Sequence, residues 1–273
     1  MTEITQANVN SAQCRLNFTV SPNFRTLDFH AHDEYEILYF LSGEVQYYIE
    51  DKAYYLMPGD LLIIPPGKLH RPVIIDENIT YERMVLMIAP AYAARLLKPS
   101  GEHFGNYAAA PCRIPTEEAQ SAEFRQMLYK MLSLEKSDVG MLQRDCYATL
   151  ILLSLIAFIK NAPVQEDGPK VRMQQVIHYI NAHFTEPLQL DDIADRFYLS
   201  KYHLLRQFKA YANSTVHNYI LAKRVVLAKE LLQKGHSPRE VSVMCGFGSY
   251  AGFYQAFVQS TGESPMQFTK KQK

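Results

Sequence analysis

The pattern of hydrophobic and polar positions changes several times along the chain. Between residues 25 and 87, short apolar and aromatic runs alternate with turn residues such as Pro58-Gly59-Asp60 and Pro65-Pro66-Gly67. Short strands separated by turns at regular intervals are typical of a β-sandwich or β-barrel. Residues 1–25 are polar, show no sustained period, and are expected to form an arm. The first part of the chain is therefore predicted to be a β domain.

The pattern becomes helical after about residue 116. Phe124, Met127, Leu128 and Met131 follow the i, i+3, i+4, i+7 spacing of an amphipathic helix. The next helix, over residues 142–159, is apolar nearly all round, so more than one of its faces must be covered. We expect a helical hairpin that packs on the β domain and leaves one face for a second subunit. The alternative is that the β domain covers every face.

Two helix–turn–helix patterns follow in tandem. The four helices are expected at residues 190–197 and 200–209 for the first pair, and at 237–245 and 249–257 for the second. Each second helix begins after a Ser that can cap it and carries an apolar pair at i and i+4 that anchors it to a core. In a helix–turn–helix the second helix enters the DNA major groove.

These changes define the predicted domain organisation and fold class. Residues 163–171 are polar and contain two prolines and a glycine, which is typical of a linker. We therefore predict an N-terminal arm and β domain at 1–112, a helical dimerisation segment at 113–162, the linker, and an all-α domain at 172–273. The predicted fold class is α+β.

The outward-facing residues of the two second helices are the candidates for DNA contact. Arg206 can donate two hydrogen bonds to guanine, and Gln255 can pair with adenine. Lys201 and Lys209 suit phosphates, with a solvated helix face as the alternative. The candidate set is Lys201, Tyr202, Leu205, Arg206, Lys209, Ser249, Tyr250, Ala251, Tyr254 and Gln255.

The distribution of charge favours a nucleic-acid partner for the C-terminal part. The chain has a formal net charge of zero, but residues 171–273 hold 13 Lys and Arg against 7 Asp and Glu. A basic domain joined to an acidic one fits a DNA-binding module fused to a domain that does not bind DNA. The four scattered cysteines form no CxxC pair, and the N-terminus lacks a signal-peptide core. We therefore expect a cytoplasmic protein with reduced thiols and no membrane partner.

Three histidines and a glutamate form a second candidate site. His30, His32 and Glu36 share parity, so on one strand they would face the same side. His70 follows the turn at residues 65–67. Imidazole and carboxylate are suitable ligands for first-row metals, but a buried His–Glu pair satisfied by hydrogen bonds is also ordinary. Tyr47 and Arg83 could add hydrogen-bond donors or lie on ordinary surface.

These residues resemble the two motifs of the cupin family over roughly residues 15–95. His30, His32, Glu36 and Gly43 match the first motif, and Gly59, Pro65, Gly67 and His70 match the second. The Asn that often follows the second motif is replaced by Ile74. The resemblance implies a small barrel. In cupin enzymes such residues hold a divalent metal, whereas in cupin domains of regulators they usually line a ligand pocket. The effector-binding candidates are His30, His32, Glu36, Tyr47, His70 and Arg83; a metal site and a plain polar core are the alternatives.

Residues 172–268 resemble the AraC family of transcriptional regulators. The matching positions are Ile193-Ala194, Ser200, Phe208-Lys209, Arg224, Ala228, Leu231-Leu232, Gly246-Phe247, Phe253, Phe257, Gly262 and Ser264-Pro265. The resemblance implies two helix–turn–helix units joined by one long helix and reading successive major grooves. Val258 stands where a lysine is usual, and Gln255 where an arginine is frequent. The second unit is therefore expected to contribute less affinity than the first.

Together the two resemblances predict an effector-responsive DNA-binding regulator. They favour an activator that senses a sugar or related small molecule. The uncovered face of the helical hairpin predicts a homodimer, and RNA polymerase is a candidate further partner. The prediction includes no catalytic residue, no metal and no cofactor. Two alternatives are a metal-dependent cupin enzyme fused to a DNA-binding domain, and a ligand-independent regulator that uses its barrel as a scaffold.

Overall fold

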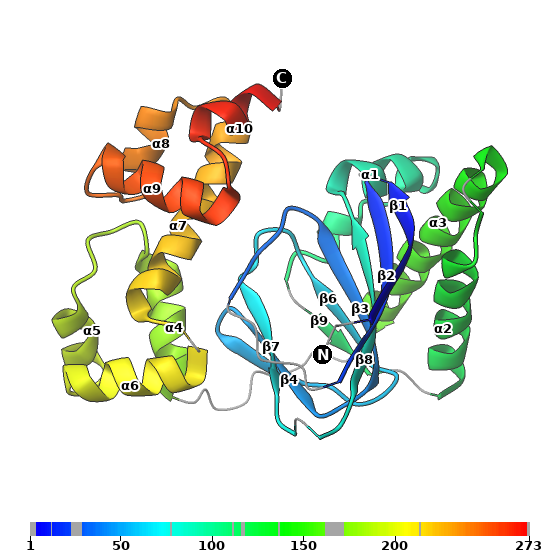
Figure 1. Cartoon of the computed structure of the whole chain (residues 1–273), viewed down its shortest axis with the longest axis horizontal. Coiled ribbons are helices and arrows are strands. Elements are labelled where there is room, and N and C mark those ends of the chain that lie inside the picture. Colours follow the sequence, from blue (N-terminus) through cyan, green and yellow to red (C-terminus); the bar gives the residue numbers. More distant parts are fainter. Residues whose placement is uncertain are drawn as a thin grey trace. The chain divides into compact units, whose positions relative to one another are not determined.

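The computed structural model describes residues 4–11, 13–22, 29–76, 78–110, 112–115, 118–135, 137–161, 172–212 and 214–271. The chain forms two compact units. The first contains most of the described residues up to 161, and the second contains the described residues from 172 onward together with the short segments 29–31 and 50–52. The first unit combines two β-sheets with helices, and the described residues between 172 and 271 form helices joined by loops (Figure 1). The predicted α+β fold class is confirmed.

The first unit contains two antiparallel sheets that enclose a common core. Six strands form the larger sheet in the order β1-β2-β8-β3-β6-β9, and three form the smaller one in the order β5-β4-β7. The strands are β1 (Ile4–Ser11), β2 (Cys14–Ser21), β3 (Tyr35–Ser42), β4 (Val45–Ile49), β5 (Lys52–Tyr55), β6 (Leu61–Ile64), β7 (His70–Ile74), β8 (Tyr81–Ile88) and β9 (Cys112–Ile114).

The stretch that the sequence was expected to place in an arm forms two strands instead. Within residues 4–21, β1 pairs with β2 along its length, and β2 pairs with β8 from Cys14 opposite Ile88 to Ser21 opposite Tyr81. The expectation of an arm is wrong here. Residues 14–21 alternate apolar and polar side chains, and Cys14 and Leu16 are buried. A two-residue period of this kind is typical of a strand with one covered face.

The larger sheet separates two cores. Leu38 and Phe40 of β3 face the smaller sheet, together with Val45 and Tyr47 of β4. Ile37 and Tyr39, of opposite parity, face the helices. The helices of this unit are α1 (Pro90–Leu97), α2 (Glu118–Leu132) and α3 (Asp138–Asn161), with short 3-10 turns η1 (Lys98–Ser100) and η2 (Phe104–Asn106). The predicted helical hairpin is thus present as α2 and α3, on the outer face of the larger sheet (Figure 1).

Helix α3 is long and apolar enough to cross a membrane by length and composition alone. This is weak support for a membrane span, because the core helix of a water-soluble domain passes the same test. Arg144 and Asp145 lie in the N-terminal half of α3, and Asp145 forms an ion pair with Arg95 of α1 at 3.0 Å. Ile151, Leu152 and Leu155 belong to the core beneath the sheet. We therefore describe α3 as a helix of the first unit.

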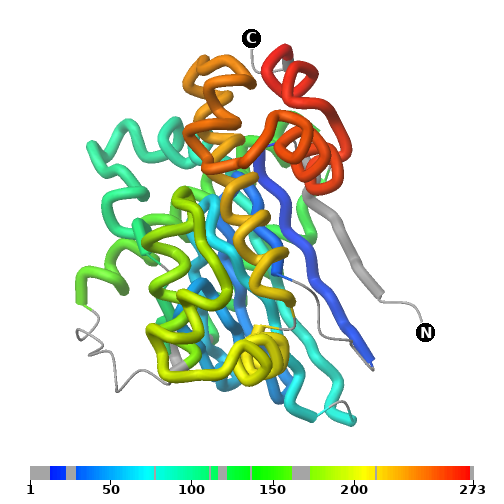
Figure 2. Tube along the Cα trace, turned by 90° about the vertical axis from the view of Figure 1, so that its left-hand side faces the viewer, coloured from blue at the N-terminus to red at the C-terminus, as the bar shows by residue number. Residues whose placement is uncertain are grey.

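The second unit contains two three-element groups joined by one long helix. Its helices are α4 (Arg172–His183), α5 (Leu190–Arg196), α6 (Lys201–Ala212), α7 (Val216–Gln233), α8 (Pro238–Met244), α9 (Tyr250–Thr261) and α10 (Pro265–Lys271). Figure 2 shows α7 running from the α4–α6 group to the α8–α10 group. Thr215 caps α7 by accepting a hydrogen bond from the Asn218 backbone N–H.

Candidate functional sites

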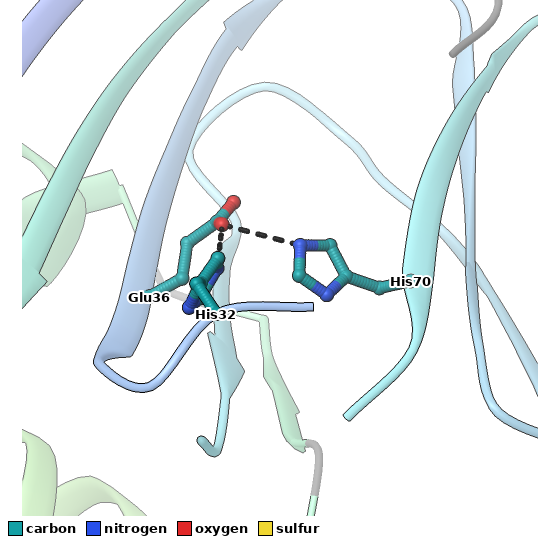
Figure 3. A group of neighbouring side chains, drawn as sticks. All are labelled: His32, Glu36 and His70. Carbon is teal, nitrogen blue, oxygen red and sulfur yellow. Dashed lines mark hydrogen bonds and ion pairs between the residues drawn. The ribbon is translucent and has the colours of Figure 1, made fainter. Parts of the chain in front are cut away.

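The space between the two sheets holds a polar group within an otherwise apolar core. Glu36 lies on β3 and has the inward parity of Leu38 and Phe40. His70 is the first residue of β7, and His32 precedes β3 in the chain. Figure 3 shows the two imidazole rings pointing at the Glu36 carboxylate from different segments. Folding therefore brings together His32, Glu36 and His70, as the sequence predicted for a shared site.

The geometry of this cluster is tight. His32 Nε2 lies 2.8 Å from Glu36 Oε2, and His70 Nε2 lies 3.3 Å from the same oxygen. The two rings meet edge to face with their centroids 5.0 Å apart. Glu36 and His70 are buried, and His32 is mostly buried. One carboxylate oxygen thus receives two imidazole nitrogens in a site with little access to water.

The other ring nitrogens define the tautomers. His32 Nδ1 donates to the Glu34 carbonyl at 2.9 Å, and His70 Nδ1 donates to the Lys68 carbonyl at 2.8 Å. A carbonyl only accepts, so each Nδ1 carries a proton and each Nε2 of a neutral ring would present a lone pair. Those lone pairs would face a carboxylate oxygen, which also only accepts. The cluster therefore requires positive charge between its members, either as further protons or as a bound cation.

The protonation equilibria agree with that requirement. Burial raises the pKa of Glu36, but the imidazoles of His32 and His70 outweigh burial, and the pKa lies well below its ordinary value. Burial lowers the pKa of His32, but the hydrogen bond and charge of Glu36 outweigh it and leave the pKa above 6.5. Both shifts favour the ionised forms of the pair.

The same residues also fit a divalent transition metal. Two imidazole nitrogens and one carboxylate oxygen lie within 4.8 Å of one another. This donor set is that of two-His-one-carboxylate sites, and a backbone carbonyl bonded to the distal ring nitrogen is the usual support of a metal-binding His. His30, which the first cupin motif would add, is exposed and lies outside this group. The parity argument placed it on a strand with Glu36, but β3 begins only at Tyr35.

Tyr47 and Arg83, the remaining effector candidates, lie in a second polar group. The Tyr47 and Tyr81 hydroxyls are 2.6 Å apart and both side chains are buried. Burial raises the pKa of Tyr47 well above its ordinary value, so its hydroxyl stays protonated. The Arg83 guanidinium lies 4.2 Å from the centroid of the Tyr81 ring and donates to Ser21 Oγ at 3.1 Å. The sequence reading missed Tyr81 and Ser21, although Tyr81 shares the parity of Arg83.

The first helix–turn–helix exposes most of its predicted DNA-contacting residues. Leu204 and Phe208 form the buried face of α6. Tyr202 is 69% exposed, and Arg206 is exposed beside it. The Arg206 guanidinium lies 5.9 Å from the Tyr202 ring centroid. Lys201, Leu205 and Lys209 are also exposed. Lys201 pairs with Asp191 of α5 at 2.9 Å, an exposed ion pair that contributes little to stability.

The second helix–turn–helix presents a less basic surface. Its recognition helix α9 is capped by Ser249, whose Oγ accepts from the Gly252 N–H at 3.1 Å. Ser237 and Glu240 form the predicted capping box at the start of α8. The exposed predicted residues on or beside α9 are Ser249, Tyr250, Ala251, Tyr254 and Gln255. None of them carries a charge, unlike Lys201, Arg206 and Lys209 of α6.

One exposed residue of the first turn was missed by the sequence reading. Tyr198, between α5 and α6, is 93% exposed and has a left-handed backbone with φ of 54°. Such a backbone is uncommon for a bulky residue. The signal available in the sequence was its place at the break between the two helices, directly before Leu199.

The comparisons with known proteins agree with this architecture. The AraC-like ligand binding domain family matches residues 18–151, and a helix-turn-helix domain family matches residues 193–271. The chain belongs to the AraC family of transcriptional regulators. The AraC family assignment confirms the predicted regulator with a ligand-binding domain and a helix–turn–helix DNA-binding domain.

Relatives of this AraC family chain extend over its whole length or over part of it. The probable transcriptional regulator LumQ of Photobacterium leiognathi is 28% identical over 258 residues, covering 91% of this chain and 96% of LumQ. The transcriptional activator RhaS of Escherichia fergusonii is 32% identical over 120 residues, 43% of each chain. The crystal structure of unsaturated fatty acid bound ToxT from Vibrio cholerae covers 96% of each chain at 12% identity, with a TM-score of 0.45.

Proposed function

We propose that this regulator senses a small polar effector, of the carbohydrate class, between the sheets of its first unit. The observation that carries the proposal is the group of inward-facing polar side chains, Glu36, His32, His70 and Tyr47, within an apolar core. Sites for small polar ligands combine apolar walls with a few placed hydrogen-bonding groups. Effector binding would favour the conformation in which both DNA-binding units engage, which is a shift of population.

We further propose that the regulator acts as a homodimeric activator that contacts RNA polymerase, not as an enzyme. A DNA partner supports a cytoplasmic location. Activation is supported by the name of the relative RhaS, which is called a transcriptional activator. The dimer is supported by an exposed apolar stripe on α3, defined by Val139, Leu142, Cys146 and Leu150. An apolar stripe of this kind matches the same stripe of a second copy across a two-fold axis.

A thermal-shift panel tests the sensor proposal. The purified chain is heated with monosaccharides, oligosaccharides and sugar acids, in buffer with EDTA. A ligand present at about 100 times its Kd adds about 2.7 kcal/mol, which raises Tm by a few degrees. Tyr47→Phe should abolish the shift. Tyr48→Phe, on the outward face of β4, is the matched control and should leave it intact. A panel without any shift, or a shift that survives Tyr47→Phe, contradicts the proposal for this site.

A bound divalent metal is the second candidate, favoured by the two Nε2 atoms that converge on Glu36. His32, Glu36 and His70 would hold the ion, which would orient an effector hydroxyl or carboxylate by coordination. The test is direct titration with Co²⁺, followed by its d–d absorption spectrum. A one-equivalent transition that is absent in Glu36→Gln would support the metal, whereas no uptake would leave a cluster held together by protons.

A further inference from the structure

Helix α7 belongs to both helix–turn–helix units at once. In its first half, Tyr219 packs edge to face against Phe208 of α6, with ring centroids 5.7 Å apart. In its second half, Val225 and Ala228 join the core formed with Phe253 of α9. Arg224 lies at the junction between these two halves. A helix that spans two small cores can bend or twist between them unless other contacts oppose this motion.

Arg224 connects the junction to the end of α4. Its Nε donates to the Phe184 carbonyl at 2.7 Å, and its Nη2 donates to the Glu186 carbonyl at 2.9 Å. Both carbonyls follow the C-terminus of α4, where backbone acceptors lack intrahelical partners and a positive charge is favoured. The two bonds use the planar fork of the guanidinium, a geometry that lysine cannot reproduce.

The same segment contacts the turn of the second unit. A Cβ atom at Gly246 would overlap the backbone carbonyl of Thr185, so the segment 184–186 lies directly against the turn between α8 and α9. The guanidinium of Arg224 also lies 5.7 Å from the ring centroid of Phe247 in that turn, within cation–π range. Arg224 therefore contacts a segment of the first helix–turn–helix unit and the turn of the second helix–turn–helix unit together.

We infer that Arg224 is a positioning residue that fixes the spacing and orientation of the two recognition helices, α6 and α9. It acts through the 184–186 segment and the Phe247 turn and touches no DNA itself. The second groove contact adds binding free energy only if the two recognition helices are already held at the spacing of the DNA grooves. If they are not, the entropy cost of ordering the two helices on the DNA offsets that free energy. The inference rests on the proposal that both α6 and α9 contact DNA.

The experiment compares binding to a whole site and to a half site. The full-length chain first selects its own site from random duplexes. Base changes in the segment read by α9 should weaken DNA binding by the unchanged chain but not by the Tyr254→Ala variant, which identifies that segment. The segment is then scrambled to give the half-site duplex. We expect the unchanged chain to prefer the whole site by about tenfold or more, the equivalent of one productive groove contact.

Arg224→Lys should bind the half site within about threefold of the unchanged chain and lose most of the preference for the whole site. Arg239→Lys, the same replacement at an exposed position of α8, should keep the preference. An independent readout is the distance distribution between spin labels at Gln207 on α6 and Gln259 on α9, in a Cys146→Ser background. It should broaden in Arg224→Lys at a temperature where circular dichroism shows the helices intact.

Each outcome decides a separate point. Equal loss of affinity for both duplexes, with an unchanged distance distribution, would show that Arg224 only caps α4 and would overturn the inference. An unchanged preference in Arg224→Lys would also overturn it. If the unchanged chain shows no preference for the whole site, the proposed two-groove binding fails, and the label distances alone then show whether Arg224 fixes the helices.

Discussion

Two glycines of the second unit share a left-handed backbone but differ in their surroundings. Gly246 has φ of 77° and contacts Thr185, whereas Gly235 has φ of 92° and an added Cβ would meet nothing within 4 Å. Gly235→Ala should therefore lower the free energy of unfolding by only about 1 kcal/mol, the cost of a left-handed backbone at a residue with a Cβ atom. Gly246→Ala should lower the free energy of unfolding by about 3 kcal/mol or more, because overlap of the new Cβ with the Thr185 carbonyl adds to the backbone strain. Urea unfolding followed by circular dichroism measures both, and equal losses would contradict the contact.

The ion pair of His32 and Glu36 gives stability a defined pH dependence. The pKa of His32 is raised from 6.5, so its contribution is complete below that value and is lost as the pH rises through the folded pKa. The pKa of Glu36 is lowered from 4.5, so its contribution is present above that value and is lost as the pH falls through the folded pKa. Both contributions are complete only between about pH 4.5 and 6.5.

Glu36→Gln should therefore lower Tm most between about pH 5 and 6, and by less at higher pH, as the pH rises through the raised pKa of His32. The measurement is Tm against pH for both proteins, with EDTA present to remove metal. Glu44→Gln, a carboxyl outside the cluster, serves as the control and should shift Tm little at any pH. A Tm difference that stays constant from pH 5 to 9 would show that the pair does not titrate as described.

At the scale of elements, the two recognition helices differ in charge, and salt dependence should reveal the difference. Lys209 on α6 is exposed and suited to a phosphate, whereas no predicted contact on α9 is basic. Lys209→Ala should reduce the slope of log K against log salt by about 0.9, the value for one lost phosphate contact. Gln255→Ala should leave the slope unchanged while weakening binding by less than Arg206→Ala does. The reverse ranking would make α9 the principal reader.

The elements also show what the sequence could and could not predict. The helix–turn–helix pairs were placed within a few residues, because Ser caps, the Leu204/Phe208 spacing and Gly246 are local signals. Strand β2 was missed although residues 14–21 alternate apolar and polar side chains; its pairing with the distant β8 is not visible in a local pattern. The cluster of His32, Glu36 and His70 was found by spacing. The sequence could not predict that His30 lies outside this cluster, because its position depends on where β3 begins.

At the scale of the whole molecule, the apolar stripe of α3 determines the expected assembly. Val139 and Leu142 are each 67% exposed and Leu150 is 52% exposed, although α3 packs its other face on the core. Leaving such a stripe in water is unfavourable, at about 25 cal/mol for each Å² of apolar area. If a second copy covers it, the two copies of α3 lie against each other, and each half of an operator can receive one DNA-binding domain.

Leu142→Glu should then convert the dimer to monomer, because the change buries a carboxylate in each half of the interface without a partner. We expect the dimer Kd to rise by about 100-fold or more, equivalent to about 2.7 kcal/mol, in sedimentation equilibrium. Met141→Glu adds the same charge at the neighbouring position, which is 51% exposed and lies on another side of α3 from the stripe, and should change the Kd little. Cys146, the exposed cysteine within the stripe, gives a second test, since a short bis-maleimide should link two copies only when the stripes meet. A Leu142→Glu protein that remains dimeric would show that another surface joins the subunits.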